Sequence, residues 1–275
     1  MASNASAASK PPGRSCRDAT HAGVRERPGI ARTPAIALVL AGGFGTRMGR
    51  PKQFLDLGGR PALYHTFRAF EDAASVGRIY AVGDGPRVEA LARTAGISKY
   101  ARCGEPGDFR QLSTKSGLLL CEEDPETVVL VHDGSRCLVT PALIDRIVEV
   151  ALGGDAPDGD APDGVVPATP VSDTVKVERN GEAIKTLDRT ELRAVQTPQA
   201  FRLGLLRRLH EAPDEYLGTA TDDASLVERD GGRVVLVDGE KTNIKLTSPE
   251  DLVLAEAILA TRDGRHPAFW ATKKS

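Results

Sequence analysis

A glycine-rich loop followed by two separated cations is the segment of this sequence best suited to chemistry. The run Ala41-Gly42-Gly43-Phe44-Gly45-Thr46-Arg47 follows a short apolar segment, and Lys52 comes five residues after Arg47. Small residues let backbone N–H groups approach a ligand closely, and two nearby cations can hold phosphate groups. The loop lacks the Gly-Lys-Ser/Thr of a Walker A motif. Its glycine spacing is also one residue too long for the dinucleotide fingerprint, and Pro51 interrupts the helix that would receive a pyrophosphate.

Two more charged residues stand where strands are expected to end. Asp133 closes the apolar run 128–132, and Lys245 follows Ile244. Ligands of open α/β sheets bind at the carboxyl ends of strands, so Asp133 is expected at a ligand, although it could instead cap the following turn. His132 is interpreted either as a core residue or as one that supports the site without contacting a ligand, because nothing in the sequence pairs with it as a base.

Alternating strands and helices must position these groups. Apolar runs predict strands at 36–40, 78–82, 127–132 and 234–237, and helical spacing predicts helices at 61–70, 86–95 and 141–152. Capping residues predict two further helix starts, at Thr221-Asp222-Asp223 and at Ser248-Pro249. The expected fold is α/β: an open, mostly parallel Rossmann-like sheet with helices on both faces.

One segment departs from the alternation of strands and helices. Asn180-Gly181 lies between β-prone runs, which predicts a β-hairpin arm at about 170–190. An isolated hairpin is barely stable in water, so we expect the arm to lie against a second subunit in a homodimer. Residues 154–164 repeat Asp-Ala-Pro-Asp-Gly and are expected to form a surface loop.

The ordered motifs resemble those of the 2-C-methyl-D-erythritol 4-phosphate cytidylyltransferases over residues 35–262. The first part is the glycine loop with Pro51-Lys52-Gln53-Phe54. The later parts are Arg110-Gln111-Leu112-Ser113, Val131-His132-Asp133, Pro170-Val171-Ser172-Asp173-Thr174-Val175-Lys176, Gln196-Thr197-Pro198-Gln199, Thr221-Asp222-Asp223-Ala224-Ser225 and Asn243-Ile244-Lys245. An ordered set of this kind is far more specific than one loop.

The resemblance implies an enzyme that joins CTP to a polyol phosphate with Mg²⁺ or another divalent cation. It implies catalytic cations around the phosphates, at Arg47, Lys52 and Lys245. It implies nucleotide-binding positions at Ala41, Gly42, Gly43, Gly45, Gly107, Asp108 and Ser113. Substrate-binding positions are Asp133, Arg136, Thr174 and Arg189, with the threonine reaching the other subunit's site and Asp133 also the metal ligand.

The chemistry implied by this resemblance needs no acid–base pair. A phosphate monoester, with a second pKa of about 6, is already ionised at neutral pH and can attack the α-phosphorus of CTP. Mutual repulsion of the anions is the obstacle, so positioned cations are the requirement. Two alternatives stay open: a ribitol-5-phosphate cytidylyltransferase and a non-catalytic nucleotide-binding homologue.

Composition limits the class of protein further. The 275 residues carry 36 Lys+Arg against 38 Asp+Glu, a net charge of −2, which argues against proteins that coat nucleic acid or anionic membranes. Four widely spaced cysteines indicate neither a zinc site nor a disulfide framework and favour a cytoplasmic protein. Residues 1–34, with six basic and two acidic residues, are expected to be a disordered tail, or alternatively an organellar transit peptide. The catalytic domain is expected at 35–265, followed by a tail at 266–275.

Overall fold

The computed structural model describes residues 33–43, 51–154 and 160–264. These residues belong to one compact unit that begins at Thr33. The expectations for residues 1–32 and 266–275 of the two tails, for positions 44–50 of the glycine loop and for positions 155–159 of the repeat loop lie outside the described residues.

An eight-stranded sheet forms the centre of this unit. Its main path runs β10 (Arg193–Val195), β7 (Gly164–Pro170), β11 (Gln199–Arg202), β6 (Val128–Asp133), β1 (Ala35–Ala41), β4 (Val76–Gly83) and β5 (Tyr100–Gly104), and β12 (Val234–Asp238) pairs with β7. Neighbours pair in parallel except where β10 and β11 are involved. The predicted α/β fold with a mostly parallel sheet is confirmed.

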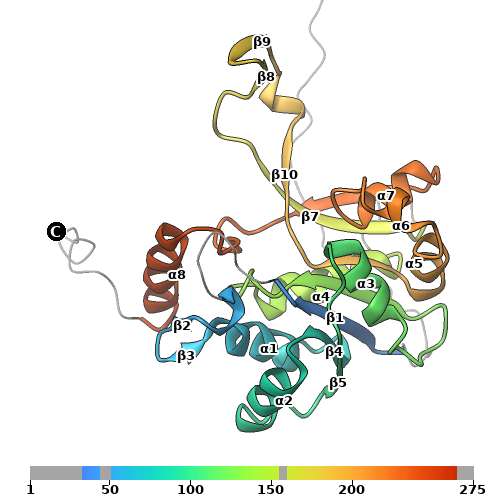
Figure 1. Cartoon of the computed structure of the whole chain (residues 1–275), viewed down its shortest axis with the longest axis vertical. Coiled ribbons are helices and arrows are strands. Elements are labelled where there is room, and N and C mark those ends of the chain that lie inside the picture. The colour runs from blue at the N-terminus through green and yellow to red at the C-terminus, as the bar shows by residue number, and fades with distance from the viewer. Residues whose placement is uncertain (1–32, 44–50, 155–159, 265–275) are drawn as a thin grey trace, which may run out of the picture. The chain divides into compact units, whose positions relative to one another are not determined.

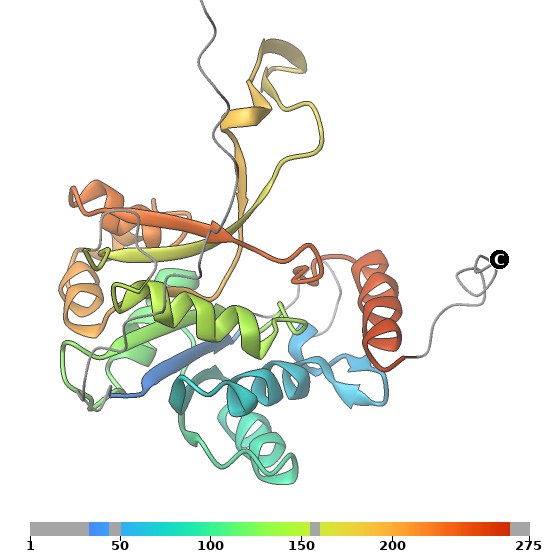
Figure 2. The ribbon, with the colours of Figure 1, turned by 180° about the vertical axis from the view of Figure 1, so that it is seen from behind.

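Helices cover both faces of the sheet. Successive residues of β1 point to opposite faces and so belong to two separate apolar clusters. Ala37 and Val39 pack with residues of α1 (Ala62–Asp72), α2 (Gly85–Thr94) and α4 (Pro141–Ala151). Ile36 and Leu38 pack with residues of α3 (Arg110–Leu118), α5 (Leu203–Leu209) and α7 (Ala224–Arg229). Figures 1 and 2, which view opposite sides, show α3 in front of the sheet in one view and α4 in front in the other. A strand buried on both faces explains the continuous apolar run in the sequence.

The remaining elements complete the edges of the fold. Helix α8 (Pro249–Arg262) packs over the small β2–β3 ribbon (Asp56–Leu57 and Arg60–Pro61) and starts with the predicted cap, a Ser248–Asp251 capping box. The predicted start at Thr221 is wrong. Helix α7 begins at Ala224 with Asp223 at the N-cap position, and the side chain that bonds its first turn is Asp222, whose carboxylate accepts the Ser225 N–H at 3.0 Å. The short α6 (Asp214–Leu217) precedes it. Within the described part of the chain, none of the helices has both the length and the apolar character that crossing a bilayer needs.

The predicted hairpin consists of β8 (Lys176–Arg179) and β9 (Glu182–Thr186). Asn180 and Gly181 have φ angles of 53° and 82°, the left-handed conformation that a tight two-residue hairpin turn requires. Figure 1 shows this arm extending beyond the ends of β7 and β10, away from the helices. Its residues Val177 and Ile184 are 38% and 53% exposed.

Candidate active site

A cavity of about 420 Å³ opens at the carboxyl ends of β1 and β6. Two sides of different character form it. One side is largely backbone, from the end of β1 and from the segment before α3, and the other carries charged side chains. The described lining residues are Leu40, Gly42, Gly43, Lys52, Gln53, Gly107, Asp108, Phe109, Arg110, Ser113, Asp133, Ser135 and Lys245.

Close packing shapes the side that is largely backbone. A Cβ atom at Gly42 would lie 2.3 Å from the Pro106 Cβ, and one at Gly107 would lie 2.3 Å from the Leu112 Cβ. Both positions therefore exclude larger residues through protein packing alone, before any ligand is considered. Ser113 holds the segment that precedes α3 in place, since its Oγ accepts the Gly107 N–H at 3.1 Å.

Asp133 lies at the centre of the charged side. Its Oδ1 accepts from Arg110 Nε at 3.1 Å, and its Oδ2 accepts from Lys245 Nζ at 2.7 Å. Burial acts to raise the pKa of Asp133, but Arg110 and Lys245 outweigh it and hold this pKa well below its usual range. The carboxylate is therefore ionised, and the Lys245 side chain, 42% exposed, is the more accessible of its two partners.

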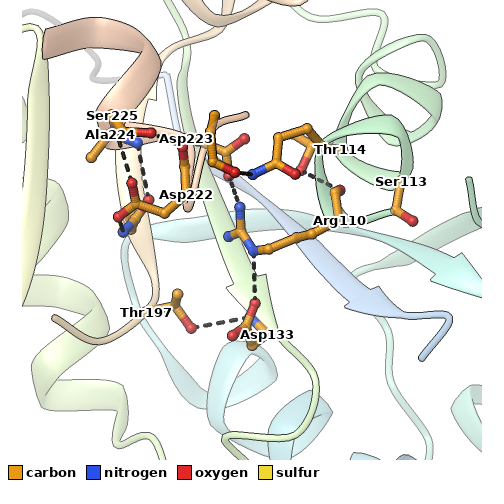
Figure 3. A network of polar contacts seen from close by, with 12 residues as sticks. Arg110, Ser113, Thr114, Asp133, Thr197, Asp222, Asp223, Ala224 and Ser225 are labelled. Atoms are coloured by element: carbon orange, nitrogen blue, oxygen red, sulfur yellow. Dashed lines mark hydrogen bonds and ion pairs between the residues drawn. The ribbon is translucent and has the colours of Figure 1, made fainter. Parts of the chain in front are cut away.

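Arg110 connects this site to a second, fully buried carboxylate (Figure 3). Its Nη1 donates to Asp223 Oδ2 at 2.6 Å, and His210 Nε2 lies 3.0 Å from Asp223 Oδ1. Burial would lower the pKa of Arg110, but the two carboxylates raise it further above its ordinary value. The sequence motif contains Arg110 but assigns it no role. Arg110 is the first residue of α3, a helix that the sequence patterns did not predict, and a cation at that position opposes the helix dipole and needs specific acceptors.

His132 is a core residue, as predicted. It is fully buried, its ring meets Phe70 edge to face, and burial lowers its pKa to about 4. Its Nδ1 lies 3.1 Å from Thr197 Oγ1 and its Nε2 lies 3.2 Å from the Arg136 carbonyl oxygen.

Comparison with known proteins identifies the family. The family model for 2-C-methyl-D-erythritol 4-phosphate cytidylyltransferase matches residues 35–261. A protein with that name from Rubrobacter xylanophilus is 63% identical over 232 residues, 84% of this chain and 97% of the relative. The chain belongs to this cytidylyltransferase family. A relative of the same name from Geobacillus kaustophilus is 43% identical over 233 residues, covering 82% of this chain and 97% of the relative.

Solved structures of cytidylyltransferases have the same fold. The Thermus thermophilus enzyme, titled 2-C-methyl-D-erythritol 4-phosphate cytidylyltransferase, aligns with a TM-score of 0.65 at 34% identity, over 82% of this chain and 98% of that one. A structure from Anaerococcus prevotii, titled 4-diphosphocytidyl-2C-methyl-D-erythritol synthase, aligns with a TM-score of 0.68 at 29% identity, over 82% and 96%. The family predicted from the motifs is therefore confirmed.

Most of the predicted cytidylyltransferase site residues meet at this cavity. Those lining it are Gly42, Gly43, Lys52, Gly107, Asp108, Ser113, Asp133 and Lys245. Ala41 lies beside it and lines an adjoining cavity of about 250 Å³ with Gly42 and Gly43. Arg47 and Gly45 lie outside the described residues.

Three predicted substrate-binding residues do not line the cavity of their own chain. The Arg136 guanidinium donates to the backbone carbonyls of Asn243, at 2.9 Å, and Val195, at 3.2 Å. Arg189, in the short 3-10 helix Arg189–Glu191, donates to the Ser172 carbonyl at 2.6 Å. Thr174 is exposed in the segment between β7 and β8. Arg189 and Thr174 therefore belong to the arm region, whereas Arg136 bonds to the backbone of β10 at the base of the arm.

The cavity suits a cation brought by a ligand better than a resident metal ion. Among the described residues no group of three or more His, Cys, Asp or Glu side chains is arranged to hold a metal. Two carboxylate side chains of the described residues line the cavity, those of Asp133, which is ionised, and Asp108. Mg²⁺ commonly binds through one or two carboxylates together with substrate phosphates and water, and this donor set fits that mode.

Proposed function

We propose that the protein transfers CMP from CTP to 2-C-methyl-D-erythritol 4-phosphate, giving 4-diphosphocytidyl-2-C-methyl-D-erythritol and pyrophosphate. Family membership over 84% of the chain supports this proposal. The single structural observation that carries it is that Lys52, Lys245 and Asp133 line one cavity together with the backbone of Gly42, Gly43 and Gly107.

The two sides of the cavity would bind different parts of the substrates. The backbone-lined side would receive the cytosine, because Gly107, Asp108 and Ser113 offer closely placed donors and acceptors there. The charged side would receive the triphosphate and the attacking phosphate. The attacking monoester is already an anion, so these residues need to neutralise and align charge rather than remove a proton.

Lys52 and Lys245 are proposed as the described catalytic cations, with Arg47 as a third. In the structure Lys245 Nζ bonds the Asp133 carboxylate at 2.7 Å, so its ammonium is already aimed at the cavity. Preplaced cations stabilise developing phosphate charge without reorganising during the reaction.

Mg²⁺ or another divalent cation is proposed to accompany CTP, with Asp133 as its protein ligand. Such an ion would supply further neutralisation of phosphate charge. Asp133 would meanwhile keep Lys245 and Arg110 in place, as its two carboxylate oxygens do in the structure.

The arm is proposed to complete the site of a second subunit in a homodimer. Thr174 and Arg189 lie apart from the cavity residues of their own chain, and an isolated two-stranded hairpin is marginally stable. A partner's arm would bring a hydroxyl and a cation to the polyol phosphate, and Arg136 would serve the same substrate from the arm's base. We also propose a cytoplasmic location, supported by the free thiols of Cys103, Cys121 and Cys137.

The function is tested by pyrophosphate release from CTP in the presence of 2-C-methyl-D-erythritol 4-phosphate and Mg²⁺. Wild-type protein should release it only when both substrates are present. Lys245→Ala should lower turnover about 10²-fold or more, as loss of a transition-state charge contact does. Lys241→Ala, an exposed lysine outside the cavity lining, is the control and should behave as wild type. Absence of pyrophosphate release by wild type would refute the proposal.

A further inference from the structure

Thr197 and His132, which do not line the cavity, form a chain of hydrogen bonds behind Asp133. Thr197, 5% exposed, comes two residues after β10, the strand that returns from the arm. Its Oγ1 lies 3.0 Å from the Asp133 backbone nitrogen and 3.1 Å from His132 Nδ1. Figure 3 shows the Thr197 hydroxyl facing the backbone of Asp133.

The donors in this chain can be assigned from its geometry. The Arg136 carbonyl oxygen can only accept, so His132 Nε2, 3.2 Å away, carries the imidazole hydrogen. Nδ1 is then an acceptor, and Thr197 Oγ1, which accepts the Asp133 N–H, donates its own hydrogen to His132 Nδ1. The two side chains together therefore hold both ends of the 133–136 turn.

The same threonine also fixes the segment that carries Lys245. The Thr197 carbonyl accepts from Asn243 Nδ2 at 2.9 Å, two residues before Lys245. Thr197 thus bonds to both segments that carry the Asp133–Lys245 ion pair. Its hydroxyl bonds the Asp133 backbone, and its carbonyl bonds the segment that carries Lys245.

We propose that Thr197 and His132 are positioning residues for the cytidylyl transfer, holding the 133–136 turn so that the Asp133–Lys245 pair faces the phosphates. The proposal rests on the proposed function. Neither side chain lines the cavity, so both act through Asp133 rather than on substrate. Their connection to β10 also joins the base of the arm to the catalytic carboxylate.

Two substitutions at Thr197 separate positioning from simple packing. Thr197→Val keeps the volume and loses the hydroxyl, whereas Thr197→Ser keeps the hydroxyl and loses a methyl group. We expect Thr197→Val to lower kcat about tenfold while the KM for CTP changes less than about twofold, because the residues proposed to contact the cytosine are unaltered. Thr197→Ser should retain kcat within about threefold, even if its Tm is the lower of the two.

Thr127→Val is the matched control. Thr127 is equally buried beside the opposite end of β6, and its Oγ1 makes no hydrogen bond to the described residues. This variant should keep wild-type kcat and Tm. Side-chain ¹⁵N NMR adds a readout independent of turnover: His132, assigned through its bonded carbons, should be neutral with its hydrogen on Nε2.

The outcomes separate this inference from the function on which it rests. Wild-type kcat in Thr197→Val, equal losses in the serine and valine variants, or a hydrogen on His132 Nδ1 would overturn the positioning role and leave the activity standing. A wild-type protein that releases no pyrophosphate from CTP and 2-C-methyl-D-erythritol 4-phosphate would overturn both.

Discussion

Removal of the buried Asp223 charge should destabilise the fold by an amount that the structure allows us to estimate. Asp223 is fully buried and accepts from Arg110 at 2.6 Å and from His210 at 3.0 Å. Breaking a buried ion pair by removing one partner costs about 3–5 kcal/mol. An asparagine retains one acceptor oxygen, so we expect Asp223→Asn to cost about 3 kcal/mol, the lower end of that range. For a chain of this size that corresponds to a fall in Tm of about 6–12 °C.

Asp230→Asn is the matched control, because Asp230 bonds Arg208 at 2.7 Å but on the surface. Its Tm should not change measurably, since exposed ion pairs contribute little. Thermal unfolding followed by circular dichroism makes the comparison. Equal Tm values for the two variants would show that the Arg110–Asp223 pair does not stabilise the fold.

The same pair has a pH signature. Burial acts to raise the pKa of Asp223, but Arg110 and His210 lower it overall, so its stabilising effect is present above the unfolded pKa of about 4. That effect is lost as the pH falls below about 4 toward the lower folded pKa. The difference in stability between wild type and Asp223→Asn should therefore be largest near neutral pH and shrink in acid. A constant difference from about pH 7 to about pH 3 would contradict this assignment.

Three further predictions concern the site and the arm. Lys52→Ala should lower kcat about 10²-fold with unchanged Tm; a variant that keeps more than half of the wild-type rate would exclude Lys52 as a catalytic cation. Gly42→Ala should destabilise by about 1–3 kcal/mol, because its Cβ would lie 2.3 Å from Pro106, whereas Gly43→Ala, whose Cβ would have no atom of the described residues within 4 Å, should keep the wild-type Tm. Mixing inactive Lys52→Ala and Thr174→Ala chains should restore about a quarter of wild-type activity after random exchange, since each mixed dimer regains one intact site. No recovery despite proven exchange would place Thr174 in its own subunit's site.

Local sequence signals predicted the elements that depend on local physics. Asn180-Gly181 specified the hairpin turn because few residue pairs tolerate two left-handed positions, and Ser248 with Asp251 specified the start of α8 through a reciprocal cap. The apolar run of β1 likewise indicated a strand buried on both faces. Thr221 failed as a cap because Asp222, next in the chain, offers a competing acceptor that is better placed.

The charged network could not be predicted in the same way. Arg110 pairs with a carboxylate 113 residues away, and periodicity shows which face of a helix is buried but not which ions meet there. Thr197 is similar, because its hydroxyl reaches Asp133 across 64 residues. Motif resemblance named Lys52, Asp133 and Lys245, whose convergence on one cavity then required the sheet.

Cytidylyl transfer to a methylerythritol phosphate is tested most directly by product formation with two competing acceptors. Purified protein is incubated with CTP, Mg²⁺ and either 2-C-methyl-D-erythritol 4-phosphate or D-ribitol 5-phosphate, and the products are followed by ³¹P NMR. We predict diphosphate-diester signals from 4-diphosphocytidyl-2-C-methyl-D-erythritol together with equimolar pyrophosphate. The kcat/KM should be at least about tenfold higher than with ribitol phosphate, a difference of about 1.4 kcal/mol in transition-state binding. Equal or better turnover of ribitol phosphate, or no diester with either acceptor, would contradict the proposed reaction.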